Sequence, residues 1–118
     1  MKYYAVTTFF VPTAHRAHIA ASITNDVVIC SNLAEDVIRR PRTVGVFGDW
    51  SAAEDCVLMN MGDIHEAGYY SHVAIEEQEF GLYPIPSAQW IYEWDEKKGG
   101  YVLLFKTTDY KGLFSRIG

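Results

Sequence analysis

The first segment, Lys2–Val11, places apolar, aromatic and β-branched residues at both alternating sets of positions. Val, Tyr, Phe and Thr favour extended backbone, and a strand that is apolar on both sides has to be covered on both faces. This segment therefore predicts a strand in the interior of a sheet. Because it lacks a small-residue cleavage site, we expect the first strand of the fold here rather than a signal peptide.

A second apolar, β-branched run, Thr43–Phe47, predicts another interior strand, and a helix is expected directly after it. The Ser51 hydroxyl can accept from the backbone N–H of Glu54 while the Glu54 carboxylate reaches back to the N–H of Ser51. Gly62 is well placed to end this helix. The helix is expected to present one apolar stripe, made by Ala53, Cys56, Val57 and Asn60 with Met59 beside them.

Alternation over Tyr69–Glu79 predicts a half-buried strand, and the segments 90–94 and 101–105 flank DEKKGG as two antiparallel strands. A chain of 118 residues is the size of one domain. We therefore predict a single α+β domain over residues 1–118, an antiparallel β-sheet with one main helix packed on one face and a C-terminal β-hairpin. The role of Thr13–Arg42 stays open: a loop, a short strand at Val27–Ser31 and helical turns stopped by Pro41 all fit its residues.

Asp63, His65 and Glu66 stand within four residues of one another, which raises the question of a metal or acid–base site. The neighbouring histidines do not follow the HExxH pattern, because His65 and His72 are seven residues apart. On a strand, His72 and Glu76 would lie roughly 13 Å apart, too far to bind one ion. We favour a polar helix-to-strand connection with no catalytic residue, metal or cofactor. A small metal-dependent hydrolase using Asp63, His65 and Glu66 is the alternative.

The region from Thr43 to Glu96 holds eleven carboxylates and no Lys or Arg, and the basic segment Arg39–Arg42 precedes it. A region of one sign repels nucleic acid and attracts basic protein surfaces. We therefore expect a protein partner with a basic surface, and neither nucleic acid nor a membrane. The carboxylates predicted to bind that partner are Glu76, Glu77, Glu79, Glu93, Asp95 and Glu96.

Trp90, Tyr92 and Trp94 form an aromatic stripe on one face of a predicted strand. Such stripes can stack bases, but the neighbouring carboxylates oppose a phosphate backbone, so we favour packing in the core. The alternative is an interface of an oligomeric accessory or structural protein, for example a homodimer. Cys30 and Cys56 form no CxxC pattern, and a reducing cytosol is the expected compartment.

Four stretches of the chain occur together: GVFGDWSAAEDCVLMNMGDIHEAGYYSHVAIEE, GLYP, WIYEWDEKKGGYV and the terminal FSRIG. As a set they resemble a group of small, largely uncharacterised proteins of bacterial phages, prophages and conjugative elements. The resemblance runs from Val44 to the end of the chain and brings no catalytic residues with it. It implies a genetic setting in which small acidic proteins often act by binding a host protein, and we therefore expect a non-enzymatic binding protein in the cytoplasm of a host cell. Inhibitors of host defence, including anti-CRISPR proteins, belong to this class.

Overall fold

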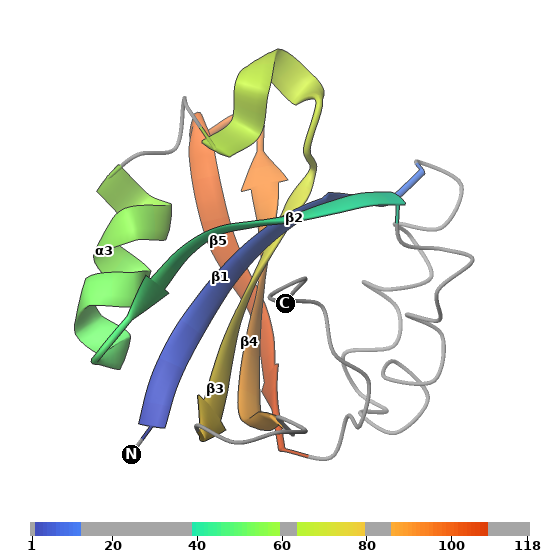
Figure 1. Ribbon diagram of the computed structural model, residues 1–118. Coiled ribbons are helices and arrows are strands. Elements are labelled where there is room, and N and C mark those ends of the chain that lie inside the picture. Colours follow the sequence, from blue (N-terminus) through green and yellow to red (C-terminus); the bar gives the residue numbers. More distant parts are fainter. Residues whose placement is uncertain (1, 13–38, 60–63, 80–85, 109–118) are drawn as a thin grey trace.

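The structure is a computed structural model that describes residues 2–12, 39–59, 64–79 and 86–108. These residues form one five-stranded antiparallel sheet and one α-helix, an α+β arrangement as expected (Figure 1). The strand order is β2-β1-β3-β4-β5. The elements are β1 (Lys2–Phe10), β2 (Arg39–Phe47), α3 (Trp50–Met59), the 3-10 turn η2 (Glu66–Gly68), β3 (His72–Glu79), β4 (Pro86–Asp95) and β5 (Gly100–Thr107).

The first strand lies where the sequence predicts it, since β1 pairs with β2 on one side and β3 on the other. The interior position predicted for Thr43–Phe47 is wrong, because β2 is longer and lies at an edge of the sheet. The interpretation of Arg39 and Arg40 as the end of a helix is also wrong. Pro41 lies within β2, where an edge strand tolerates its missing N–H. The rest of Thr13–Arg42, residues 13–38, lies outside the described residues.

The helix begins differently from the expected Ser51–Glu54 capping pair. Asp49 caps it, because the Asp49 Oδ1 accepts the backbone N–H of Ala52 at 2.8 Å. The Glu54 carboxylate instead accepts the hydroxyl of Tyr92 on β4 at 3.0 Å. Asp is as good an N-cap as Ser, and Asp49 directly precedes the first helical residue, Trp50, so its side chain reaches the free N–H of the third, Ala52.

We expect Asp49→Ala to lower the free energy of unfolding by about 0.5–2 kcal/mol through loss of this cap. Ser51→Ala, two positions along the same turn, is the matched control and should change it by less than about 0.5 kcal/mol, since Ser51 is exposed. Urea unfolding of both variants measures the difference. A larger cost at Ser51 than at Asp49 would contradict the observed cap.

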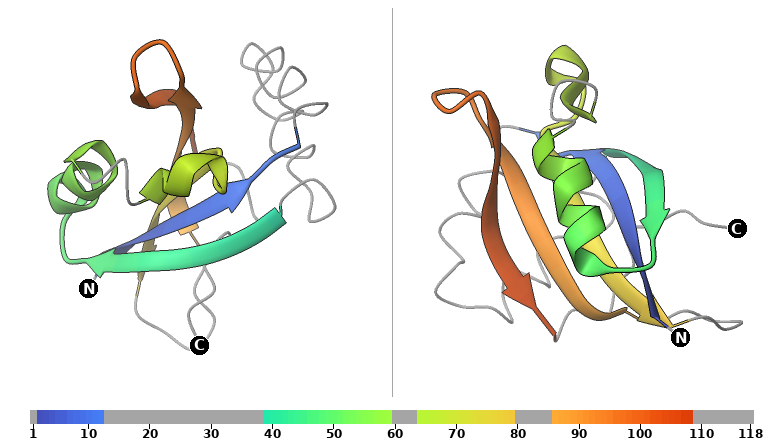
Figure 2. Two further views of the ribbon diagram at one scale, coloured as in Figure 1. Left: turned by 90° about the horizontal axis from the view of Figure 1, so that it is seen from above. Right: turned by 90° about the vertical axis from the view of Figure 1, so that its left-hand side faces the viewer.

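The helix α3 lies over one face of the sheet (Figure 2, right), and the residues between them form an apolar core. Ala53 and Val57 of α3 are fully buried within it. Of the stripe, Tyr92 belongs to this core with 1% of its surface exposed, and Trp90 and Trp94 are partly buried and pack against it, so the favoured packing role is confirmed. Met59 is 77% exposed, and its place on the predicted helix stripe is wrong. The core cluster comprises Val6, Ala53, Val57, Ile64, Val73, Ile75, Tyr92 and Tyr101.

The opposite face of the sheet is also buried, which the half-buried interpretation of Tyr69–Glu79 does not anticipate. His72, Glu76 and Gln78 of β3 have no exposed surface. Their polar atoms are bonded inside the protein; for example, Gln89 Nε2 donates to Glu76 Oε2 at 2.7 Å. Polar residues on this strand therefore mark a buried polar layer rather than solvent. No helix among the described residues is long and apolar enough to cross a membrane.

Candidate functional site

The six carboxylates predicted to bind a partner do not form one surface. Because β3 and β4 run antiparallel, with His72 opposite Glu93 and Gln78 opposite Pro86, Glu79 lies at the far end of the sheet from Glu93. The eight residues from His72 to Glu79 make seven steps along the strand, which span roughly 23 Å at the rise of a strand. The predicted set therefore divides between two ends of the sheet.

Two of the six side chains are held by contacts within the protein, Glu76 in the interior and Glu77 at a partly exposed position. Glu76 is fully buried and cannot belong to a contact surface in this fold. Glu77 accepts hydrogen bonds from Ser87 Oγ (2.7 Å), Tyr4 Oη (2.8 Å) and Lys2 Nζ (3.1 Å). The bond from Ser87, with those from Tyr4 and Lys2, holds the pKa of Glu77 below its usual value. Glu77 therefore joins three strands and has little capacity left for a partner.

Asp95 shapes the turn between β4 and β5. Its Oδ1 accepts the backbone N–H of Lys97 at 2.9 Å and that of Lys98 at 3.1 Å. This is the local bonding by which an Asp side chain stabilises a turn. Asp95 therefore positions its neighbours, and of the six carboxylates Glu93, which is partly exposed, and Glu96, which is exposed, are the other two at this end of the sheet.

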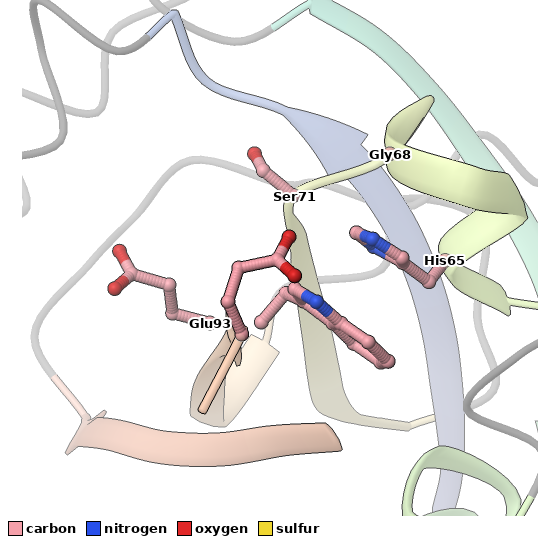
Figure 3. Close-up of a pocket in the computed structure, with 6 residues that line it drawn as sticks. His65, Gly68, Ser71 and Glu93 are labelled. Atoms are coloured by element: carbon pink, nitrogen blue, oxygen red, sulfur yellow. The ribbon is translucent and has the colours of Figure 1, made fainter. Parts of the chain in front are cut away.

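Glu93 and Glu96 line a pocket of about 130 Å³ beside the start of β3. The Glu93 side chain extends from β4 toward η2 and the ring of His65 (Figure 3). The other lining residues are His65, Gly68, Ser71 and Trp94. Two segments distant in sequence, residues 65–71 before β3 and residues 93–96 at the end of β4, thus meet at this pocket.

A chain of hydrogen bonds fixes the Glu93 carboxylate. The backbone N–H of Val11 donates to Ser71 Oγ at 2.9 Å, and Ser71 Oγ lies 2.7 Å from His72 Nδ1. The other ring nitrogen of His72, Nε2, lies 3.1 Å from Glu93 Oε2. His72 is fully buried, stacked on Phe9 with ring centroids 5.5 Å apart, and Ser71 is 5% exposed.

A hydrogen-bonded Ser–His–Glu set of this kind has the composition of a hydrolytic triad. However, its hydroxyl is buried and already accepts a backbone N–H, so we interpret it as a support for Glu93.

His65 closes one wall of the pocket. Its ring stacks on the indole of Trp94 with centroids 3.8 Å apart and an angle of 7° between the planes. His65 Nδ1 donates to the carbonyl oxygen of Tyr70 at 2.8 Å, which fixes the ring and leaves Nε2 as the other polar atom. The stack and this bond hold the wall rigid without occupying the carboxylates.

The pocket contains carboxylate oxygens that accept no hydrogen bond from the described residues. Among the described residues, Glu96 has no hydrogen bond or ion pair, and the bonded oxygen of Glu93 is Oε2, which leaves Oε1 open. Two carboxylates in one small concavity attract a cation with N–H donors, such as a guanidinium or ammonium group. A drug-sized ligand needs a pocket of about 300–1,000 Å³, so the volume of 130 Å³ suits a side-chain head group instead.

The alternative site, Asp63, His65 and Glu66, is not brought together in the described residues. Asp63 lies outside them. Glu66 has a positive φ of 49° and pairs with Arg42 at 3.6 Å, whereas His65 turns its ring to Trp94. No group of three His, Cys, Asp or Glu residues that could hold a metal occurs in the described part of the chain.

Cys56, the one cysteine that the structure describes, is half-buried on α3. Burial raises the pKa of its thiol, which keeps it protonated near neutral pH. It therefore offers no reactive nucleophile in this state.

A comparison of the chain with family models, curated proteins and solved structures finds no match. The site is therefore interpreted from its own geometry.

Proposed function

We propose that this protein is a small, non-enzymatic binding protein of a phage or mobile element that inhibits a host protein by occupying a basic surface. The host protein is one that acts in defence, with CRISPR effectors as one class, or in other handling of nucleic acid. The pocket of Glu93 and Glu96 takes a Lys or Arg side chain of that surface, and the inhibitor acts in the host cytoplasm.

The observation that carries this proposal is the pair of carboxylates with open acceptor oxygens in a pocket of side-chain size. Glu93 is held in place by His72, so little conformational entropy is lost when a cation binds to it. A cation bound there would be partly desolvated against Trp94 and His65, which strengthens its attraction to the carboxylates. Basic side chains that contact nucleic acid phosphates suit such a site, because carboxylates offer them similar acceptor oxygens.

The proposal also uses the resemblance of Val44 to the C-terminus to proteins of phages and mobile elements. Such a setting favours inhibitors that bind host proteins. The acidic segment from Thr43 to Glu96 gives a long-range field that speeds the approach of a basic partner.

The test is an affinity purification from bacterial host lysate, followed by mass spectrometry and by kinetics with the partner recovered. The double variant Glu93→Gln/Glu96→Gln should bind that partner at least about tenfold more weakly, a loss of about 1.4 kcal/mol. Glu93→Gln keeps an oxygen for His72, so the fold should persist. Raising the salt concentration should slow association more than it speeds dissociation.

Glu79→Gln is the control, because it removes one carboxylate charge from an exposed residue at the opposite end of β3; the single variants Glu93→Gln and Glu96→Gln are compared with it at equal charge. The binding of Glu79→Gln should match that of the unmodified protein. A partner that binds the double variant as tightly as the unmodified protein would refute the role of the pocket. Recovery of a partner with an acidic contact surface would refute the proposed function itself.

A further inference from the structure

One side of the pocket of Glu93 and Glu96 is held in place from β2. His65 and Gly68 form this side and belong to the same turn (Figure 3). In the described part of the chain, the hydrogen bonds, ion pairs and ring contacts that join Glu66, Gly68 and Tyr69 to other segments come from two arginines of β2. Two strands, β1 and β3, separate β2 from β4 in the sheet. The position of the turn therefore depends on a strand that does not itself reach the pocket.

Of the two arginines, Arg40 makes the stronger contact. Its Nη2 donates to the carbonyl oxygen of Tyr69 at 2.9 Å, and its guanidinium lies over the Tyr69 ring at 4.0 Å and the Phe10 ring at 4.7 Å. A guanidinium that is stacked and hydrogen-bonded at once has a defined orientation. Arg42 pairs with Glu66 at 3.6 Å, but their side chains are 63% and 45% exposed, and such ion pairs add little.

The bond from Arg40 reaches the pocket through one peptide group. The carbonyl of Tyr69 and the N–H of Tyr70 belong to the same planar unit. That N–H donates to the carbonyl oxygen of His65 at 3.2 Å, and the next carbonyl, that of Tyr70, accepts from His65 Nδ1 at 2.8 Å. Arg40 therefore holds the peptide to which both the backbone and the ring of His65 are bonded.

The backbone is strained on both sides of this contact. Arg40 has a φ of 54° and Glu66 a φ of 49°, and they are the two residues other than glycine with positive φ in the described part of the chain. A residue with a Cβ keeps this conformation only where its surroundings over-determine it, and such residues cluster at functional sites. Both residues lie where β2 meets the turn, which points to a role for this contact beyond folding.

We propose that Arg40 is a positioning residue of the pocket: it fixes the turn that carries His65 and Gly68, and so keeps the pocket in the shape that binds a cation. This inference rests on the proposed function, which assigns the pocket to a Lys or Arg side chain of the partner. Arg40 does not line the pocket, and its positive charge opposes a cation there. Its contribution is therefore geometric.

The first arm of the test measures the order of the turn in the free protein by NMR. In Arg40→Asn the order parameter of the Gly68 amide should fall from about 0.85, the value of rigid backbone, to below about 0.6. The His65 ring protons should also lose part of the ring-current shift that stacking on Trp94 gives them. Asn tolerates positive φ better than most residues, so the backbone of β2 should persist. Arg40→Lys keeps a donor for the Tyr69 carbonyl and should restore part of the order.

Arg42→Asn is the matched control, because it removes the same charge from an exposed residue of the same strand. It should leave the Gly68 order parameter and the His65 ring shifts unchanged. Amide shifts of β3 and β4 report whether each variant keeps the fold.

The second arm measures the affinity of the pocket for N-acetyl-arginine amide, followed through the amide shifts of Glu93 and Glu96. Arg40→Asn should raise the Kd at least about threefold, because the pocket is no longer preorganised. Each variant removes a positive charge, and by charge alone either change would favour a cation at the two carboxylates. Arg42→Asn should therefore leave the Kd unchanged or lower it, and the two variants differ in sign.

The proposal is overturned if either the order of the turn or the Kd is unchanged in Arg40→Asn. An equal loss of affinity in Arg42→Asn would also overturn it. Failure of the probe to bind the unmodified protein would instead count against the proposed function of the pocket. The order parameter of Gly68 would then decide the role of Arg40 by itself.

Discussion

Replacing Glu76, Glu77 and Glu79 together by lysine should leave the protein unfolded. The acidic pattern of the sequence predicts that all three side chains are exposed, and reversing exposed charges changes the free energy of unfolding little. In the structure Glu76 is fully buried and accepts a hydrogen bond from Gln89. Lysine there would bury an ammonium group and face the Gln89 amide donor. Leaving an uncompensated charge in the interior costs about 3–5 kcal/mol, against a total stability of about 5–15 kcal/mol for a domain.

Single variants separate the three positions. Glu76→Lys should account for most of the loss, and Glu77→Lys should add to it by setting an ammonium group against Lys2 and removing the acceptors of Tyr4 and Ser87. Glu79→Lys, at an exposed site, should stay within about 0.5 kcal/mol of the unmodified protein. Circular dichroism and urea unfolding measure all three. A well-folded Glu76→Lys protein with unchanged stability would contradict the burial of this side chain.

The strands show what a single sequence can and cannot specify. Apolar residues on both sides of β1 correctly predict an interior strand, because both alternating sets of positions in its sequence are hydrophobic. In β3 the same burial is hidden, since His72, Glu76 and Gln78 face a polar interior. Periodicity reports hydrophobicity, and it cannot distinguish a polar side chain bonded inside the protein from one in water. The edge position of β2 is equally hidden, because strand order depends on pairings distant in sequence.

The helix cap shows a different limit. Asp49 and Ser51 are both good caps, two residues apart, and the Ser51–Glu54 spacing favours the second. The position of Tyr92 decides the outcome, because its hydroxyl binds the Glu54 carboxylate. No local pattern contains that contact.

The candidate site was only partly accessible to sequence analysis. The charge pattern includes Glu93 and Glu96 among the partner-binding residues, but it groups them with Glu76 and Glu79, which lie in the interior and at the far end of the sheet. The sequence offers His65 only as part of the alternative metal site, whereas in the structure it lines the same pocket as Glu93 and Glu96. The sequence pattern assigns Ser71 to no site, and it assigns Trp94 to the aromatic stripe rather than to a pocket. Their placement follows from the pairing of His72 with Glu93, a register that requires the three-dimensional fold.

The second large effect is expected at the contact between helix and sheet. Ile75 on β3 and Val57 on α3 are both fully buried in the same core cluster. Ile75→Ala should lower the free energy of unfolding by about 2–5 kcal/mol, because it loses the burial of the side chain and leaves a cavity. Val57→Ala removes less volume and should cost less than Ile75→Ala. Met59→Ala is the control on the same helix, and since Met59 is 77% exposed it should cost less than about 0.5 kcal/mol.

The double variant Val57→Ala/Ile75→Ala tests whether helix and sheet share this core. Residues that share a cavity or contacts typically depart from additivity by about 0.5–3 kcal/mol, whereas distant sites add within about 0.5 kcal/mol. We expect a departure of that larger size, measured by urea unfolding of the four proteins of the cycle. Additive losses, or a Met59→Ala variant as unstable as Val57→Ala, would contradict the packing of this face of α3 on the sheet. In that case the helix would be held mainly by its cap at Asp49 and the bond between Glu54 and Tyr92.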